Sequence, residues 1–303
     1  MKRSLKIVLI IASVALVVSV ATSVIAIVFM GNGSNNGTVD TLGYGELADP
    51  SDLTDGEKIA GYANVLDYGA KPGDNGDDTA AFEAAIKKNI AVYVPAGKYI
   101  VSRPLPFNDQ NFFGDGVNAT QIVSVMTDAT KPMFYLGGSS TLSDMTVGYS
   151  DKLITGSEKR GERVAVSCGA AIGFGPGGGI KDAAFKNVGT AVYSDSTDGY
   201  GTSNCAFARI SVEGFTNCGF DFICKAGYGN VFKQITAIAS KGEGVFTFSG
   251  VGGSDMLENI TVKDCKLQYA VGYTELAGVM LDTPVCSQSD FSKSVVYKLE
   301  EQE

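Results

Sequence analysis

The sequence of 303 residues predicts an all-β protein: a parallel β-helix with a short capping α-helix at its N-terminal end, preceded by one transmembrane helix. Three observations predict this arrangement. They are an uncharged apolar run over residues 7–30, an amphipathic segment over residues 77–89, and a six-residue pattern that recurs through the second half. Hydrophobic residues make up 45% and charged residues 19% of the chain, which is too apolar for a disordered protein.

The first thirty residues predict a membrane anchor. Residues 1–6 form a basic stub, and residues 7–30 carry no charge and exceed the ~20 residues that span a bilayer. A cleaved secretory signal is the alternative, but the apolar run continues past the small residues Ala21, Thr22 and Ser23. We therefore expect a single-pass signal anchor with its basic end in the cytoplasm and the C-terminal domain outside the cell. If the segment were cleaved, the protein would be secreted.

The remainder divides into a linker, one domain and a tail. Residues 31–58 are rich in Gly, Asn, Asp and Ser and show no periodicity, which predicts a flexible linker. Residues 59–286 form the β-helix domain, and residues 287–303 form a tail that either caps its far end or stays loose.

An amphipathic segment, DDTAAFEAAIKKN, predicts the capping helix. Asp77, Asp78 or Thr79 can serve as its N-cap. The apolar residues that share one helical face are Ala81, Phe82, Ala85 and Ile86. An open solenoid end exposes apolar interior and an unpaired strand edge, and this helix would cover both.

The recurring pattern, apolar-x-x-apolar-x-apolar, predicts stacked coils. Its copies are LSDMTV, IKDAAF, FARISV, FKQITA and LENITV, and the last three start 25 residues apart. Short repeated strands with no helix between them are typical of a parallel β-helix. Ile210, Ile235 and Ile260 would then form an inward column. The outward column would read Thr146, Ala184, Ser211, Thr236 and Thr261, a nearly uncharged face.

Three consecutive motifs carry a family resemblance: ANVLDYGAKPGDNGDDTAAFEAAI from Ala63, AVYVPAGKYIVSRPL from Ala91, and FFGDGVNATQI from Phe112. Together they resemble the opening of the pectate lyase superfamily, which contains pectate lyase-like, polygalacturonase-like and phage tailspike-like proteins. With the repeats, the resemblance covers residues 62–286. It implies a right-handed single-stranded parallel β-helix that acts on or binds polysaccharide. A homotrimer, as in tailspike-like members, is left open by the sequence.

Composition excludes several kinds of function. A net charge of -9 gives no basic surface for nucleic acid. The chain has no His, which excludes Ser-His-Asp systems, His-containing zinc sites and the His-containing motif of polygalacturonase-like relatives. Any catalysis must use carboxylates, Lys, Arg, Tyr or Cys. The family's catalytic residues therefore cannot be carried over position by position.

The third position of the repeat is the candidate catalytic site. It reads Asp144, Asp182 and Arg209, followed by Gln234 and Asn259, and stacked coils place such residues ~4.8 Å apart. Two carboxylates beside a guanidinium could serve a glycoside hydrolase, or a lyase that uses Arg as base. The alternative is a bend, where Asp and Asn are favoured and Asp182 with Arg209 forms a surface ion pair.

The charged insertion over residues 149–164 is the candidate substrate-binding loop. Lys159, Arg160 and Arg163 could contact acidic sugars from the wall of a cleft, although a solvated loop would look the same. Aromatic side chains that could stack on sugars are Tyr193, Tyr200, Tyr228, Tyr269 and Tyr273, with packing as their alternative role.

No cofactor is predicted. Asp74, Asp77 and Asp78 could hold Ca²⁺, but helix capping already explains these acids. The chain has six cysteines, which could form disulfides outside the cell or serve as small buried apolar residues.

Two functions stay open at this point. The protein is either a membrane-anchored polysaccharide lyase or glycoside hydrolase, or a non-catalytic carbohydrate-binding or adhesion module on the same scaffold.

Overall fold

The computed structural model describes residues 54, 60–168, 175, 177–195, 201–223, 229–249, 254–274 and 280–300. Of residues 1–59 only Thr54 is described, so the predicted anchor over residues 7–30 and the rest of the predicted linker over residues 31–58 lie outside the described residues. In the described part of the chain, no helix is both long and apolar enough to cross a membrane.

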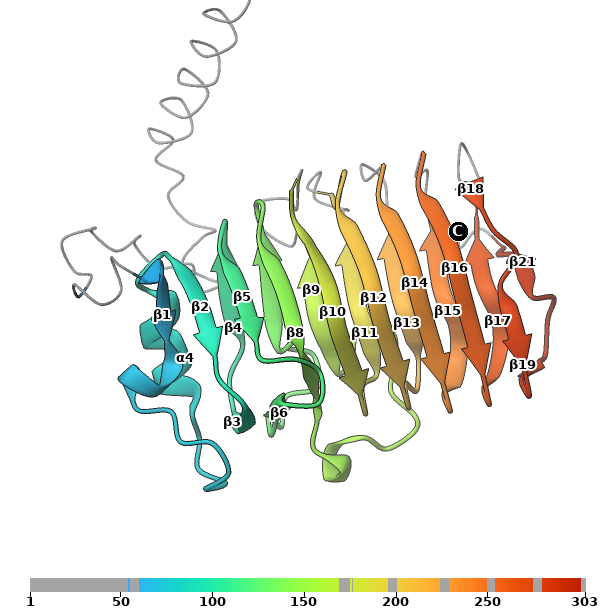
Figure 1. Cartoon of the computed structure of the whole chain (residues 1–303). Helices are drawn as coiled ribbons and strands as arrows, with labels where there is room; N and C mark the ends of the chain where they lie inside the picture. Colours follow the sequence, from blue (N-terminus) through green and yellow to red (C-terminus); the bar gives the residue numbers. More distant parts are fainter. Residues whose placement is uncertain are drawn as a thin grey trace, which may run out of the picture. The chain divides into compact units, whose positions relative to one another are not determined.

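Two parallel sheets wind along one axis, as the repeats predicted (Figure 1). The twelve strands of the first sheet, sheet A, are β1 (Tyr62–Asn64), β2 (Ala91–Val94), β3 (Gly97–Val101), β5 (Asn111–Gly114), β6 (Thr120–Ser124), β8 (Thr141–Tyr149), β10 (Gly179–Lys186), β12 (Ala206–Glu213), β14 (Val231–Ile238), β16 (Met256–Lys263), β18 (Met280–Leu281) and β19 (Val285–Ser287). The nine strands of the second, sheet B, are β4 (Leu105–Asn108), β7 (Phe134–Gly137), β9 (Val164–Cys168), β11 (Thr190–Asp195), β13 (Cys218–Ile223), β15 (Lys241–Ser249), β17 (Lys266–Tyr273), β20 (Asp290–Phe291) and β21 (Val296–Lys298).

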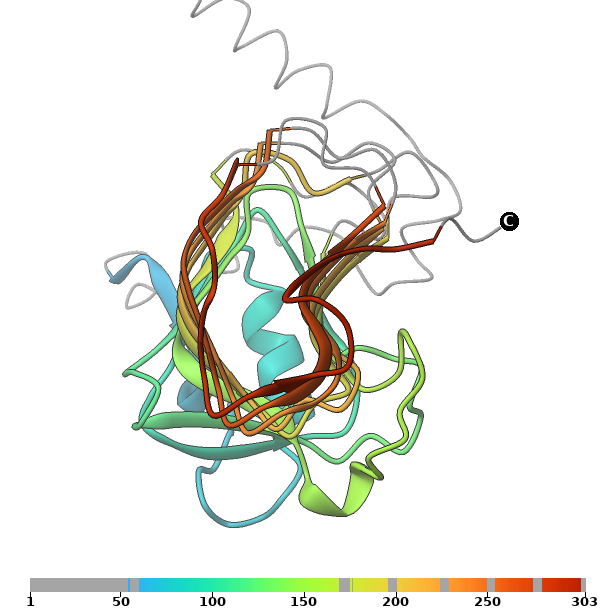
Figure 2. The ribbon, with the colours of Figure 1, turned by 90° about the vertical axis from the view of Figure 1, so that its right-hand side faces the viewer.

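The register of sheet A follows the sequence repeat. Ile210 lies opposite Ile235 and Ile235 opposite Ile260, and all three are at most 1% exposed. The predicted inward column is therefore confirmed. Viewed along the axis, the coils superimpose and enclose a common interior (Figure 2). Phenylalanines dominate its centre, where the Phe207 and Phe232 rings stack 4.8 Å apart.

One residue per coil bends sheet A into two arms. The third repeat position has a positive φ of 49–58° in each of Asp144, Asp182, Arg209, Gln234 and Asn259. In earlier coils this bend separates β5 from β6, and the continuous strand β8 pairs with both. The interpretation of the third position as a bend is confirmed, even for Arg209 and Gln234, which rarely adopt this conformation.

Helix α4 (Thr79–Ile86) lies at the N-terminal end of the coil, as predicted (Figure 1), and across its opening when viewed along the axis (Figure 2). Ala81, Phe82 and Ala85 are buried and Ile86 is half-buried, and the Phe82 ring contacts those of Tyr99 and Phe112. The carboxylate of Asp77 accepts a hydrogen bond from the Thr79 amide at 3.0 Å. Two single-turn 3-10 helices, η2 (Val65–Tyr68) and η3 (Asp151–Leu153), complete the described elements.

The tail continues the coil for most of its length. Strands β20 and β21 both pair with β17, so residues after Cys286 extend sheet B. Among the described cysteines none is in a disulfide: Cys168, Cys205, Cys218 and Cys265 are buried and Cys286 is exposed. The sixth, Cys224, lies outside the described residues.

Candidate functional site

The candidate catalytic residues meet on the outer surface of sheet A. Arg209 donates to Asp182 from Nε and Nη2, both at 2.6 Å. Asp144 lies beside Asp182 on the neighbouring strand β8, because Ser143 is opposite Lys181 and Met145 is opposite Ala183. The side chains of Asp182 and Arg209 remain 37% and 52% exposed. The predicted arrangement of two carboxylates beside a guanidinium therefore exists.

This arrangement suits a surface ion pair better than proton transfer. The hydrogen bonds from Arg209 lower the pKa of Asp182, which keeps that carboxylate ionised. A general acid instead needs a raised pKa to hold its proton near neutral pH. Both charges of the pair are also satisfied by each other and screened by solvent.

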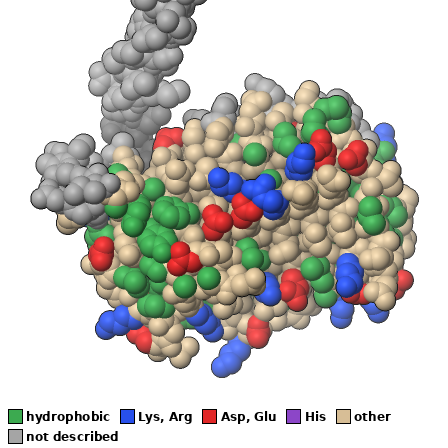
Figure 3. Space-filling model, in the orientation of Figure 1, with side chains coloured by type: hydrophobic (Ala, Val, Ile, Leu, Met, Phe, Trp, Pro, Cys, Tyr) green, Lys and Arg blue, Asp and Glu red, His purple; other side chains and the backbone are tan. Residues whose placement is uncertain are grey.

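Aromatic side chains gather at the N-terminal end of the same face, over β1, β2 and β5 (Figure 3). The rings of Tyr93 and Phe113 stack 5.2 Å apart, and Tyr62 meets both edge-on. The Tyr93 hydroxyl donates to Asp115 at 2.8 Å. Because the rings pack against one another, their faces form a small surface cluster and not an open stacking platform.

The charged insertion crosses from β8 to sheet B and is fixed at two points. Near its middle, Glu158 is 8% exposed and accepts hydrogen bonds from the amides of Thr155 and Gly156 and from the Thr216 hydroxyl. At its end, Arg163 is also 8% exposed and donates to the carbonyls of Met126 and Thr127.

The predicted substrate-binding residues thus have different surroundings. The Arg163 guanidinium is buried against the Tyr149 ring, 5.5 Å from its centroid, and already has two carbonyl acceptors. Lys159 is exposed. Arg160 lies over sheet B, where it donates to Asp221 from Nε at 2.7 Å and from Nη2 at 2.5 Å, and to the Ser249 hydroxyl at 2.8 Å.

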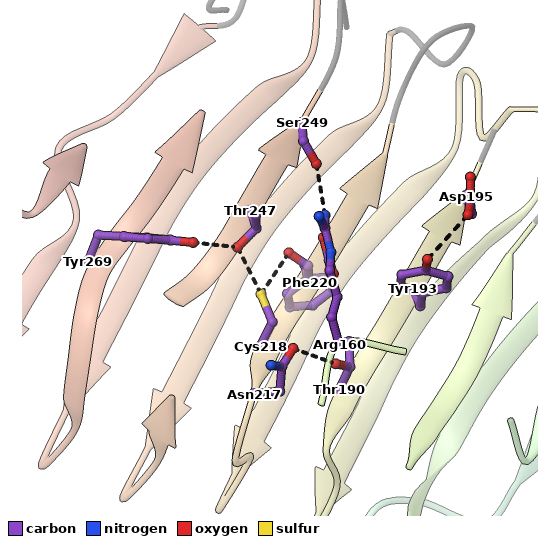
Figure 4. A network of polar contacts seen from close by, with 11 residues as sticks. Arg160, Thr190, Tyr193, Asp195, Asn217, Cys218, Phe220, Thr247, Ser249 and Tyr269 are labelled. Atoms are coloured by element: carbon purple, nitrogen blue, oxygen red, sulfur yellow. Dashed lines mark hydrogen bonds and ion pairs between the residues drawn. The ribbon is translucent and has the colours of Figure 1, made fainter. Parts of the chain in front are cut away.

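The outer face of sheet B around Arg160 holds a second carboxylate pair, and Figure 4 shows Arg160, Tyr193 and Asp195 on this face. Asp195 ends β11, and Asp221 lies on the neighbouring strand β13, opposite Tyr193. Strands ~4.8 Å apart and an offset of two residues at ~3.3 Å each give a Cα–Cα distance of roughly 8 Å. The Tyr193 hydroxyl donates to Asp195 at 3.3 Å.

Burial raises the pKa values of several groups in this cluster. Asp221 is 2% exposed, and burial raises its pKa while the hydrogen bonds from Arg160 oppose that rise. Burial likewise raises the pKa values of Tyr193 and Tyr269, so both phenols stay neutral. When burial raises the pKa of one carboxyl of a pair, that carboxyl can act as the acid and the second carboxylate as the base.

A chain of weaker polar contacts borders this pair on β13, β15 and β17 (Figure 4). The Cys218 thiol and the Thr247 hydroxyl lie 3.2 Å apart, and the hydroxyls of Thr247 and Tyr269 lie 3.1 Å apart. Burial raises the pKa of Cys218, so the thiol is a poor nucleophile and serves as a packed structural group.

The acids considered for calcium are engaged within the fold. Asp74 accepts from the Gly76 amide at 2.7 Å, and Asp78 from the amides of Lys71 and Ile100 at 2.8 and 3.0 Å. Across the described ranges, no group of three or more Cys, Asp or Glu side chains could hold a metal ion.

Asp195 and Asp221 were not among the residues predicted from the sequence. The available signal was the second apolar stretch of two successive repeats, TAVYSD and CGFDFI, each of which contains one acid: Asp195 at the end of the first and Asp221 within the second. The predicted tyrosines Tyr193 and Tyr269 lie at this cluster and Tyr273 lies further along β17, whereas Tyr200 and Tyr228 are outside the described residues.

The coil, the bent sheet and the helical cap define a pectate lyase-like parallel β-helix. The chain belongs to the rhamnogalacturonase A/epimerase, pectate lyase-like family, whose model matches residues 62–281. No curated protein matches the chain significantly in sequence.

Solved structures share the fold at low sequence identity. The catalytic unit of the thermostable GH87 alpha-1,3-glucanase from Streptomyces thermodiastaticus has a TM-score of 0.57 and 18% identity, over 78% of this chain and 42% of its own. A GH87 alpha-1,3-glucanase catalytic domain in complex with tetrasaccharides has a TM-score of 0.56 and 12% identity, over 84% of this chain and 41% of its own. Pre-mature gene product 12 of bacteriophage phi29 has a TM-score of 0.50 and 16% identity, over 73% of this chain and 33% of its own. The chain thus spans less than half of each of these structures.

Proposed function

We propose that the protein is a glycoside hydrolase that cleaves polysaccharide on the outer face of sheet B. The observation that carries the proposal is the carboxylate pair of Asp195 and Asp221 on neighbouring strands. Strand geometry places their Cα atoms roughly 8 Å apart, a spacing from which the two side chains can reach the separation of about 6.5–9.5 Å between carboxyl groups that inverting glycosidases use. Retaining enzymes need a closer pair.

The two carboxyls have different roles in this mechanism. Asp221 is the general acid once Arg160 no longer pairs with it, because burial raises the pKa of this carboxyl and the hydrogen bonds from Arg160 oppose that rise. Asp195 is the general base that activates water on the opposite side of the sugar ring. Tyr193 holds Asp195 in place through its hydroxyl. Lys159, exposed on the adjoining loop, contacts the glycan from the side.

Relatives support a glycan as the substrate. Members of the matched family are named for rhamnogalacturonase and epimerase activity, and two structural relatives are alpha-1,3-glucanases, one of them bound to tetrasaccharides. We further propose that residues 7–30 anchor the enzyme in the membrane with the β-helix outside the cell. The homotrimer stays a prediction that sedimentation analysis would test.

The test is to incubate the full-length protein with acidic and neutral polysaccharides, including alpha-1,3-glucan, with and without Ca²⁺. Mass spectrometry of the products separates hydrated ends, which a hydrolase makes, from unsaturated ends, which a lyase makes. We expect hydrated products, and a loss of about 10²–10⁴-fold in Asp195→Asn and in Asp221→Asn.

Asp182→Asn is the matched control. It also removes a paired surface carboxylate, but on sheet A, and we expect it to retain activity. If Asp182→Asn lost activity while Asp195→Asn and Asp221→Asn kept it, the site would instead be Asp144, Asp182 and Arg209.

The alternative, a non-catalytic carbohydrate-binding module, is favoured by one observation. Arg160 covers Asp221, which leaves that carboxylate 2% exposed. Retention of the protein on one glycan, without any product from any glycan, would establish this second function.

A further inference from the structure

Arg160 is the residue through which the charged loop contacts sheet B at Asp221. Its Nε and Nη2 donate to both carboxylate oxygens, at 2.7 and 2.5 Å, and Nη2 also donates to Ser249 on the next strand. A guanidinium that donates to three acceptor atoms is held in a defined position. Its side chain remains 35% exposed while Asp221 is 2% exposed, so it forms the outer cover of the carboxylate.

The loop does not depend on Arg160 for its own position. Glu158 ties it to Thr216, and Arg163 ties its end to the carbonyls of Met126 and Thr127. Asp151, near its start, accepts a hydrogen bond from Asn187. The side chain of Arg160 can therefore move, or be replaced, while the loop backbone keeps these anchors.

The groups that face Asp221 from the surrounding strands are acidic or weakly acidic. They are Tyr193 and Asp195 on β11, Cys218 on β13 and Tyr269 on β17, while the residue opposite Asp221 on β15 is the uncharged Thr247. Among these described neighbours, the positive charge comes from Arg160. A buried carboxylate without a cationic partner takes up a proton in place of remaining charged.

We infer that Arg160 is a positioning residue that acts through Asp221: paired, it holds the carboxylate charged and covered, and withdrawn, it leaves Asp221 protonated and open to a glycan. Charge and protons balance in this step, because Asp221 gains one proton from solvent as the guanidinium moves away. The role of Asp221 as the acid rests on the proposed function. The ionic coupling between Arg160 and Asp221 does not depend on that function.

The test is the titration of Asp221 in the full-length chain, followed by NMR with ¹³C-labelled aspartate carboxyl groups and assigned with Asp221→Asn. In Arg160→Gln the midpoint is expected to rise by about 1–2 pH units, because an adjacent cation lowers the pKa of a carboxyl by that order. Arg209→Gln is the matched control, since it breaks an equally bidentate pair on sheet A and should leave Asp221 unchanged.

Arg160→Lys retains the charge but loses the bidentate geometry, and it also serves if Arg160→Gln does not fold. We expect a smaller upward shift in this variant. An unchanged Asp221 midpoint in the folded Arg160 variants would overturn the inference, as would an equal shift in Arg209→Gln.

Activity provides a second, separable readout. If the wild type cleaves a glycan, the alkaline limb of its pH–rate profile should move upward in Arg160→Gln by the shift that NMR measures. A merely structural Arg160 would lower stability and leave that limb in place. If no glycan is cleaved, the proposed function fails, while the NMR titration still decides the coupling.

Discussion

Asp255 is a buried carboxylate whose charge opposes folding. It is 1% exposed, and its Oδ1 accepts a hydrogen bond from the Asn230 amide at 2.7 Å. Burial raises its pKa to about 6, well above the value of about 3.9 expected in the unfolded chain. The folded state therefore binds a proton more tightly than the unfolded state. This contribution to stability is fully present below about pH 4 and is lost as the pH rises through about 6.

Asp255→Asn keeps an oxygen acceptor for Asn230 and removes the charge. We expect the variant to be more stable than the wild type at pH 7, by about 1–3 kcal/mol, and nearly equal at pH 4. Urea denaturation of both proteins across pH 4–8 measures this. Asp290→Asn, at an exposed acid on β20, is the control. A constant difference between wild type and Asp255→Asn over this range would contradict the prediction.

Single residues show where sequence reasoning reached its limit. The bend at the third repeat position was predictable, because Asp144, Asp182 and Asn259 are residue types that tolerate positive φ. The pairing of Arg160 with Asp221 was not, because 61 residues separate them and their contact depends on how far the loop crosses sheet B. The local periodicity of the sequence does not encode the path of this loop across sheet B.

Helix α4 closes the first coil mainly through one side chain. Phe82 is fully buried, with ring centroids 5.6 Å from Tyr99 and 5.9 Å from Phe112. We expect Phe82→Ala to destabilise this end by about 3–5 kcal/mol, since removing a buried phenylalanine leaves a cavity. Hydrogen exchange should show the loss of protection in α4, β2 and β3.

Glu83→Ala is the control on the same helix. Glu83 pairs with Arg103 at 3.0 Å, but the pair is partly exposed, so its loss should cost less than about 1 kcal/mol. A cost for Phe82→Ala no larger than that for Glu83→Ala would show that the helix is not the cap that its burial indicates.

Elements differed in how well the sequence predicted them. Strands β12, β14 and β16 of sheet A follow the 25-residue spacing, which gave their register directly, whereas β8 and β10 share the six-residue pattern at irregular spacing. The earlier strands β2 to β6 are only four or five residues long and do not carry the six-residue pattern, so the family resemblance was needed to predict them. The tail was left open because β20 and β21 are two and three residues long, too short for a periodic signal.

The molecule as a whole is a stack in which each coil contacts its neighbours. Phe232 lies at the centre of this stack, fully buried, with Phe207, Phe220, Phe222, Phe246 and Phe248 around it at 4.8–5.9 Å between ring centroids. Stability in such solenoids is approximately a sum of terms for single coils and for the contacts between adjacent coils. A change at Phe232 weakens the contacts on both sides, whereas a change at α4 weakens one.

Phe232→Ala should therefore act over a longer distance than Phe82→Ala, although each removes one buried phenylalanine ring. We expect a loss of about 3–5 kcal/mol, with protection against hydrogen exchange falling together in β12 to β16 and much less in β2 to β6. Phe232→Leu, which retains most of the volume, should show the same pattern at a smaller magnitude. If protection fell equally in every coil, the chain would unfold as a single unit, and the nearest-neighbour description would be wrong for this protein.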